Sequence, residues 1–170
     1  MKNKGFSLVE LIVVVLIMAI VAVALAPQVA KWVNNSKLST DVQTRNSLKE
    51  QCEIALADPE AFDEVKDGGY TITITKTSSG TTCVYTDESG TPITPDPDSD
   101  KYWANLFKVS GVSNADEFKD LFQIKSKPET GSIVLHVVIY DQGFTRASLT
   151  GISGNDDIEV VSDTIPSEDN

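Results

Sequence analysis

An uninterrupted apolar segment near the N-terminus constrains this chain more than any other feature of its sequence. Every residue from Leu11 to Ala26 is apolar, and Lys2 and Lys4 precede the segment. A helix from Phe6 to Ala26 would rise about 31 Å, which matches the hydrocarbon thickness of a bilayer. Because positive charge stays on the cytoplasmic side, we expect this helix to enter the membrane and to export the residues after it.

Two kinds of export signal begin in this way. Cleavage of an ordinary secretory signal after Ala26 would release a protein that begins at Pro27. Glu10 argues against that alternative, because a carboxylate at the centre of a membrane helix costs about 2.5–3.5 kcal/mol, and less near an end. A discarded signal gains nothing from this residue, whereas a retained helix can use the carboxylate to bind a partner.

The stretch Gly5-Phe6-Ser7-Leu8-Val9-Glu10 and the apolar run after it closely resemble the class III signal of type IV prepilins. That signal has a short basic leader ending in Gly, then Phe, Ser or Thr, Leu, a Glu at the fifth mature position, and a long apolar run. The resemblance covers residues 2–26. It implies cleavage by prepilin peptidase between Gly5 and Phe6, N-methylation of Phe6, and retention of the helix as an anchor.

Glu10 has two interpretations once Phe6 is the first residue. Cleavage creates an ammonium group at the end of an apolar helix, and charges that leave water need partners. We therefore expect Glu10 to pair with the Phe6 amine of a neighbouring subunit, or of its own chain, and so to set the axial register. The alternative is that Glu10 only caps the helix N-terminus, where negative charge is favoured.

The helical pattern resumes after Pro27 and predicts one helix from Phe6 to Ala57, which Asp58-Pro59 would end. Its expected apolar stripe consists of Val29, Trp32, Val33, Leu38, Val42, Leu48, Cys52 and Leu56. Opposite charges lie four residues apart in the pairs Lys37–Asp41, Asp41–Arg45 and Lys49–Glu53.

Pro27 and Trp32 each have more than one interpretation. Proline removes a backbone hydrogen bond and clashes with the preceding turn. The pilin resemblance implies a kink or local melting there, which would let a filament stretch, and the alternative is a bend in a continuous helix. Trp32 is either an anchor at the membrane interface before extraction or a contact with the head or a neighbouring subunit.

Residues 58–170 have the pattern of a globular head. Short helices are expected at 58–66, 101–108 and 115–122, and strands at 70–75, 82–86, 133–140, 144–150 and 158–161. Turns are expected at 78–80 and 141–143, and a loop at 90–100. The predicted fold class is α+β, with a leader at 1–5, a membrane or filament-core helix at 6–27, its amphipathic continuation at 28–57, and an antiparallel sheet packed on the C-terminal half of the helix. The pilin resemblance implies the same fold.

The two cysteines, Cys52 and Cys83, could meet where the sheet packs on the helix. A disulfide that closes about thirty residues would add about 3–4 kcal/mol to the free energy of unfolding, and two buried thiols are the alternative. No cysteine follows Cys83, so the sequence departs from the bridged C-terminal loop of many pilins. Some Gram-positive pilins share this departure, which favours a Gram-positive major pilin.

Motifs for catalysis and cofactor binding are missing from the sequence. The single histidine, His136, lies in a dense apolar strand, and no Gly-rich phosphate loop follows a strand. Asp96, Asp98 and Asp100 alternate as in a calcium loop, yet Lys101 and Phe107 replace the Gly and Glu that an EF-hand requires. We therefore expect a solvated acidic loop, no cofactor and no enzyme activity.

The charge of the chain and the resemblance together predict its partners. With 25 acidic and 14 basic residues and a net charge of −11, the chain would repel phosphate and is a poor candidate for nucleic-acid binding. The resemblance implies a single-pass precursor in the cytoplasmic membrane, assembled with copies of itself by a pilus assembly platform. The product would be an extracellular filament for adhesion, twitching motility or biofilm formation. A pseudopilin of a type II secretion or competence system is the nearest alternative.

Overall fold

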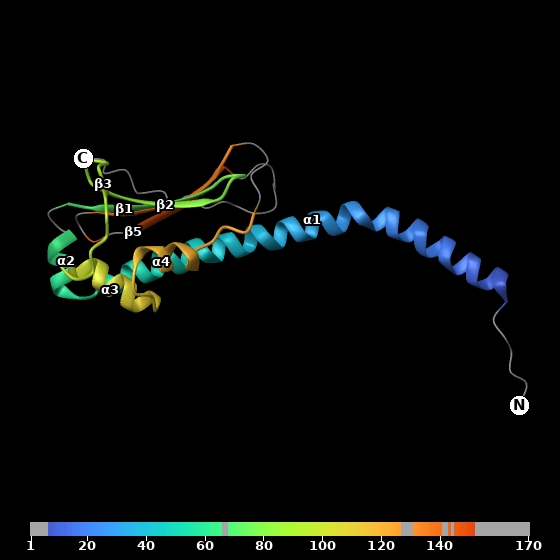
Figure 1. The fold of residues 1–170 in the computed structure, drawn as a ribbon, viewed down its shortest axis with the longest axis horizontal. Helices are drawn as coiled ribbons and strands as arrows, with labels where there is room; N and C mark the ends of the chain where they lie inside the picture. Colours follow the sequence, from blue (N-terminus) through green and yellow to red (C-terminus); the bar gives the residue numbers. More distant parts are fainter. Residues whose placement is uncertain (1–6, 66–67, 127–130, 141–142, 144, 152–170) are drawn as a thin grey trace, which may run out of the picture. The chain divides into compact units, whose positions relative to one another are not determined.

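The computed structural model describes residues 7–65, 68–126, 131–140, 143 and 145–151 (Figure 1). Its elements are α1 (Leu8–Ala55), α2 (Pro59–Val65), β1 (Tyr70–Lys76), β2 (Thr81–Asp87), β3 (Pro92–Ile93), α3 (Lys101–Ser110), α4 (Ala115–Leu121), β4 (Ile133–Ile139) and β5 (Thr145–Thr150). The chain divides into two compact units at Ser36 and Lys37. We call the second unit the head; α1 runs from the first unit into it.

The sheet is antiparallel throughout, with the strand order β3-β2-β1-β4-β5. β1 and β2 form the expected hairpin, in which Lys76 lies opposite Thr81. β1 also pairs with β4, and the chain between β2 and β4 contains β3, α3 and α4. The short strand β3 was not predicted, because two residues in a proline- and aspartate-rich segment carry no alternating pattern. The expected strand at 158–161 and turn residues 141–142 lie outside the described residues.

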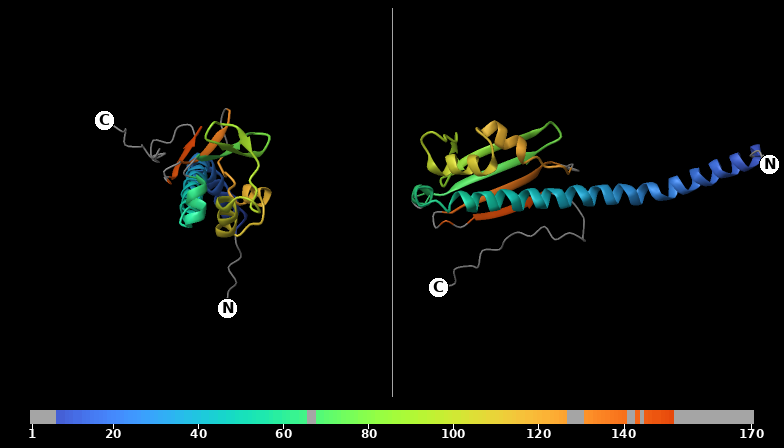
Figure 2. Two further views of the ribbon diagram at one scale, coloured as in Figure 1. Left: turned by 90° about the vertical axis from the view of Figure 1, so that its left-hand side faces the viewer. Right: turned by 90° about the horizontal axis from the view of Figure 1, so that it is seen from below.

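One face of the sheet forms the core of the head with the C-terminal half of α1. All four inward residues of β4 are buried, at 0–1 % exposure: Ile133, Leu135, Val137 and Ile139. The same cluster contains Leu48 and Cys52 of α1 and a group of aromatic residues from α3 and α4. Figure 2 shows α1 lying along one side of the sheet in the head. The predicted α+β fold is confirmed.

α1 ends at Ala55, two residues earlier than predicted, because Asp58 starts a new helix. The Glu60 N–H donates to Asp58 Oδ1 at 2.9 Å, and the Phe62 N–H donates to the Asp58 carbonyl oxygen at 3.0 Å. Asp58 is thus the N-cap of α2, and Pro59 occupies the first helical position, where its missing N–H costs nothing.

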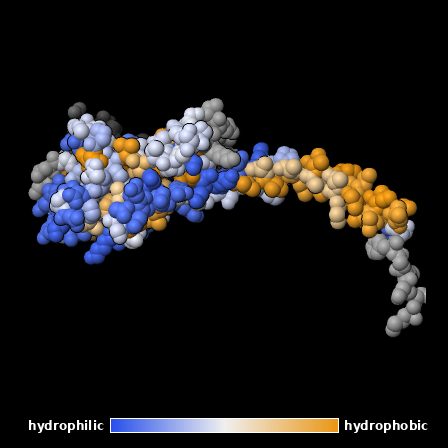
Figure 3. Space-filling model, in the orientation of Figure 1, coloured by the Kyte–Doolittle hydropathy of each residue, from blue (hydrophilic) through white to orange (hydrophobic). Residues whose placement is uncertain are grey.

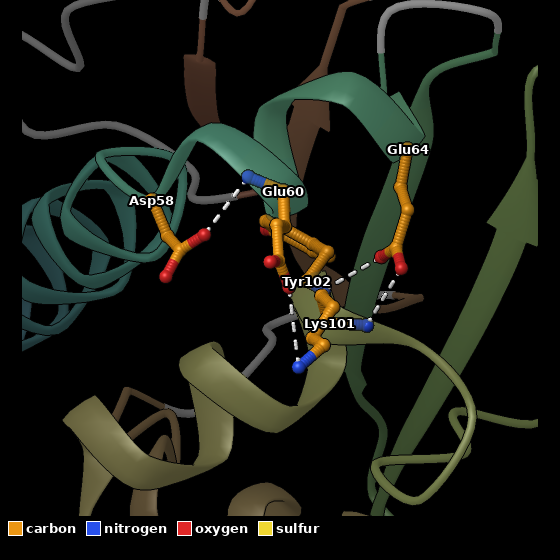
Figure 4. Close-up of polar contacts among 5 residues, drawn as sticks. All are labelled: Asp58, Glu60, Glu64, Lys101 and Tyr102. Atoms are coloured by element: carbon orange, nitrogen blue, oxygen red, sulfur yellow. Dashed lines mark hydrogen bonds and ion pairs between the residues drawn. The ribbon is translucent and has the colours of Figure 1, made fainter.

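The start of α3 is held by an acidic side chain of α2. Glu64 Oε1 and Oε2 accept the backbone N–H groups of Lys101 and Tyr102, both at 2.9 Å (Figure 4). Lys101 Nζ also lies 3.2 Å from Glu60 Oε2. A carboxylate on the first N–H groups of a helix satisfies donors that lack partners within the helix, so Glu64 ties α2 to α3.

The buried stripe of α1 differs from the expected one. Leu38, Leu48, Cys52 and Leu56 are buried as predicted, and Val42 is partly buried. Two charged residues, Asp41 and Arg45, join them at 1 % and 7 % exposure. The sequence pattern placed these two on the polar side of the helix, and that was wrong because Asp41 bonds to the backbone before β4.

The expected stripe also does not extend N-terminally as a buried face. Val29, Trp32 and Val33 are 48 %, 65 % and 45 % exposed. They precede Lys37, the first residue of the head, and the described part of the first unit contains only α1 and Ser7 before it. A single helix has no partner within its own unit to cover such residues.

Candidate functional site

The N-terminal half of α1 carries a continuous apolar surface. Its large apolar side chains from Leu8 to Leu25 are 44–77 % exposed, and Figure 3 shows this part of α1 as an almost continuous orange surface. By length and composition α1 is the one helix in the described part of the chain that could cross a membrane. An apolar surface of this extent is not stable in water and therefore needs a bilayer or other helices to cover it.

Ser7 and Glu10 close the N-terminus of this helix. The Ser7 N–H donates to Glu10 Oε2 at 2.9 Å, and the Val9 N–H donates to Ser7 Oγ at 3.4 Å. The Leu11 N–H donates to the Ser7 carbonyl oxygen at 3.2 Å, so Ser7 is the N-cap. This reciprocal arrangement is a capping box, which satisfies two otherwise unpaired donors. Glu10 therefore caps the helix, which is the second of the two interpretations, and this does not exclude the first.

Ser7 is the residue of this site that sequence reasoning missed. A Ser followed three residues later by Glu, immediately before an apolar run, is the pattern of a capping box and was available in the sequence. The bond from the Ser7 N–H holds the Glu10 carboxylate at the N-terminal end of α1.

Pro27 and Trp32 lie in the same helix. α1 contains Pro27 without interruption, which corresponds to the continuous-helix alternative. Trp32 is 65 % exposed. Its roles as a membrane-interface anchor or as a contact with the head or a neighbouring subunit stay predictions.

A family model for the prokaryotic N-terminal methylation motif matches residues 1–26. The chain carries the class III signal of type IV pilins. The motif supports a prepilin of the pilin-like or pseudopilin class, whose members are structural subunits rather than enzymes. The signal and the apolar helix fit a membrane-anchored precursor that later assembles outside the cell. No solved structure matches the chain.

The prepilin residues at the cleavage site lie outside the described part of the structure. Gly5 and Phe6 belong to residues 1–6, so cleavage between them and methylation of Phe6 stay predictions. Glu10 and Pro27 are placed by α1, but their roles in assembly are likewise predictions.

Cys52 and Cys83 are free thiols. Cys52 is buried and Cys83 is half-buried. Burial raises the pKa of Cys52 to about 12. Burial also raises the pKa of Cys83. Both thiols are therefore protonated at neutral pH and poor nucleophiles, in line with a structural role.

The acidic segment before α3 forms turns. The Asp98 N–H donates to Asp96 Oδ1 at 3.0 Å, and the Asp100 N–H donates to the Asp96 carbonyl oxygen at 2.9 Å. Among the described residues no group of three or more acidic, histidine or cysteine side chains could hold a metal ion. Asp96, Asp98 and Asp100 are thus not brought together as ligands.

His136 lies in the centre of β4, on the face of the sheet opposite the core. It pairs with Thr73 on one side and Ser148 on the other. Burial lowers its pKa from the ordinary value of 6.5. These two partners carry hydroxyl groups and no carboxylate, so the cross-strand positions do not supply the acid of a nucleophile–histidine–acid set.

Proposed function

We propose that this chain is the structural subunit of a type IV pilus. Prepilin peptidase cuts it between Gly5 and Phe6, Phe6 is N-methylated, and α1 polymerises with copies of itself into an extracellular filament. The observation that carries the proposal is the exposed apolar surface from Leu8 to Leu25, which the described part of the chain leaves uncovered.

This apolar surface must be shielded from water both before and after assembly. The bilayer covers it while the precursor is stored, and the helices of other subunits cover it in the filament, so the helix exchanges one apolar environment for another. The head has its own core and stays outside. The cytoplasmic motors and the platform supply the energy for assembly. The chain itself supplies the surfaces and charges through which the subunits contact one another.

Glu10 is the assembly residue in this proposal. In the isolated chain its carboxylate is already bound to the Ser7 N–H. A new ammonium group at Phe6 would be unfavourable at the positive end of a helix dipole unless a carboxylate neutralises it. Pairing between Glu10 of one subunit and the amine of the next would satisfy both charges only at one axial register.

The nearest alternative function is that of a pseudopilin in a secretion or competence system. Its N-terminal signal is the same, and the two functions differ in the product. Abundant filaments sheared from the cell surface favour the pilus subunit, whereas short assemblies confined to the envelope favour the pseudopilin.

The deciding experiment is mass spectrometry of the mature N-terminus in sheared surface material. An N-methylated chain beginning at Phe6, as the main protein of surface filaments, is the expected result. A chain that begins at Pro27 in the culture supernatant would mean that the helix is a discarded signal. Methylated Phe6 found only in membranes would support the pseudopilin.

A further inference from the structure

The head has two chemically different ends along the direction of its strands. Tyr70 of β1 pairs with Asp87 of β2, whereas Lys76, at the other end of β1, pairs with Thr81. Tyr70 stacks on Tyr102 at a ring distance of 5.5 Å, which places the α2–α3 corner at the Tyr70 end. Figure 1 shows α2 and α3 at one end of the sheet and the β1–β2 hairpin at the other.

The α2 end has a shallow open hollow of about 380 Å³, lined by Glu64, Gly68, Gly69, Tyr70, Asp87 and Glu88. We call it the acidic hollow. Glu64 is engaged by α3, and Asp87 accepts hydrogen bonds from Ser89 Oγ at 2.6 Å and the Thr91 N–H at 2.8 Å. Glu88 is exposed, and its Oε2 lies 3.8 Å from a Cβ built on Gly68. Its carboxylate is thus available at the rim of the hollow.

Negative charge accumulates around this hollow. Burial, followed by the charges of Glu64 and Asp96, raises the pKa of Asp100. Burial, followed by the charges of Asp100 and Glu64, raises the pKa of Tyr70. Burial, and after it the neighbouring carboxylates, make each of these groups harder to ionise than in water. The field of the carboxylates also favours an incoming cation.

Three lysines lie away from the α2 end of the head, and we call their region the lysine end: Lys37, Lys76 and Lys125. Lys76 is at the hairpin end of β1, opposite Tyr70. Because α1 ends next to α2, the stretch from Asp41 to Ala55 separates Lys37 and Lys125 from the α2 end by about 21 Å. The Lys125 side chain is exposed, and its backbone N–H donates to Asp41 Oδ1 at 2.6 Å. That bond holds Lys125 against α1, one helical turn from Lys37. The Asp41 carboxylate is 1 % exposed and faces inward, so it does not cancel the lysines at the surface.

We propose that the acidic hollow and the lysine end are complementary docking surfaces through which the heads of successive subunits contact one another. The inference rests on the proposed function, because only a filament repeats one head above another in a fixed orientation. One molecule presents opposite charges at opposite ends, so its copies attract head to tail and repel head to head. The partner at the hollow is therefore a second copy of this chain, bound through Lys125 or its neighbours.

Charge reversal tests the contact in cells that assemble this chain. Glu88→Lys and Lys125→Glu each place like charges together and should each lower the yield of sheared filaments on the order of fivefold. The double variant Glu88→Lys/Lys125→Glu restores opposite charges with the two ends exchanged and should recover most of the yield. Asp120→Lys, a charge reversal at an exposed position of α4, is the matched control and should assemble normally.

Immunoblots of the membrane fraction check that each full-length variant accumulates. If a reversal variant does not accumulate, Glu88→Gln and Lys125→Gln remove the charges more gently and should still lower the yield. Unchanged yields for every variant, beside normal wild-type filaments, would overturn this contact alone. A double variant no better than the single ones would overturn it too. Absence of wild-type filaments would instead overturn the proposed function, and this contact with it.

Discussion

The carboxylate of Asp41 in α1 accepts the backbone N–H of Lys125 at 2.6 Å, 84 positions later in the chain. Its second oxygen accepts the N–H of Ser126 at 2.9 Å. The two bonds satisfy consecutive donors in the segment that leads into β4, at a site that is almost closed to water. The helix that continues from the anchor is therefore fastened to the sheet by a buried charge as well as by apolar contacts.

Replacing Asp41 should lower the free energy of unfolding of the head. Asp41→Asn places an amide NH₂ where one of the two backbone N–H donors needs an acceptor. The loss of that buried hydrogen bond should lower the free energy of unfolding by about 2–4 kcal/mol. Denaturant unfolding of the full chain in detergent, followed by the fluorescence of buried Trp103, measures the change. Glu50→Gln, an exposed position on the same helix, is the control and should stay within about 0.5 kcal/mol of wild type. An equally stable Asp41→Asn variant would show that the two bonds contribute nothing.

Gly69→Ala should also destabilise the head, because a methyl group has no room there. A Cβ at Gly69 would overlap the Ile139 carbonyl oxygen, at the end of β4 that pairs with Tyr70. The backbone must shift to accept it, which costs about 1–3 kcal/mol. Gly68→Ala is the matched neighbour, since its nearest atom is a side-chain oxygen at 3.8 Å. Thermal unfolding should give a lower melting temperature for Gly69→Ala than for Gly68→Ala. Equal melting temperatures would contradict the close approach of Gly69 to the Ile139 carbonyl oxygen.

Both cysteines should be available to alkylation without a reducing agent. The structure has Cys52 and Cys83 as free thiols, the first buried and the second half-buried. Iodoacetamide should add two groups to the unfolded chain, and in the folded chain it should modify Cys83 before Cys52. Intact-mass measurement counts the additions. A chain from surface filaments that accepts none until it is reduced would instead contain a disulfide.

His136 should make the head less stable as the pH falls from 7 to about 5.5. Its folded pKa lies below the ordinary value of 6.5, so the unfolded chain binds the proton more readily in this window. This contribution to stability is therefore fully present above the unfolded pKa and is lost as the pH falls from there through the lower folded pKa. Since His136 is the only histidine in the sequence, the unfolding free energy of His136→Gln should vary less over this range. Parallel pH curves for the two proteins would refute the assignment.

Glu10→Val should leave the membrane helix intact and impair assembly. Valine removes a carboxylate from an apolar environment, so insertion becomes easier. The same change removes the acceptor of the Ser7 N–H and the expected partner of the Phe6 amine. Membrane fractionation should recover the precursor while sheared filaments fall at least about tenfold. Glu10→Gln tests charge separately from hydrogen bonding, and normal filaments from Glu10→Val would rule out a role in register.

The N-terminal site could be predicted from the sequence because its chemistry is local. The cleavage motif, the apolar run and the capping pattern of Ser7 and Glu10 all lie within one short stretch, and a single helix realises them without help from distant residues. The β1–β2 hairpin was predictable for the same reason, since alternation and a short polar turn define both strands and their register.

The periodicity of the sequence could not predict contacts between residues far apart in the chain. Asp41 and Arg45 looked like surface charges because helical spacing says nothing about a loop that returns far along the chain to bury them. The end of α1, by contrast, is local: Asp58-Pro59 predicted it to within two residues, because Asp58 caps the next helix. The acidic hollow is lined by residues of α2, β1 and β2, so no single segment of the sequence could predict it.

The sequence by itself therefore determined the anchor and its processing signal, because an apolar helix and a short peptide motif act through their own residues. Tertiary structure alone decided which polar groups of α1 are buried, whether the cysteines meet, and how charge divides between the two ends of the head. The physical reason is that burial and electrostatic fields arise from elements distant in the chain, and these become neighbours only when the core forms.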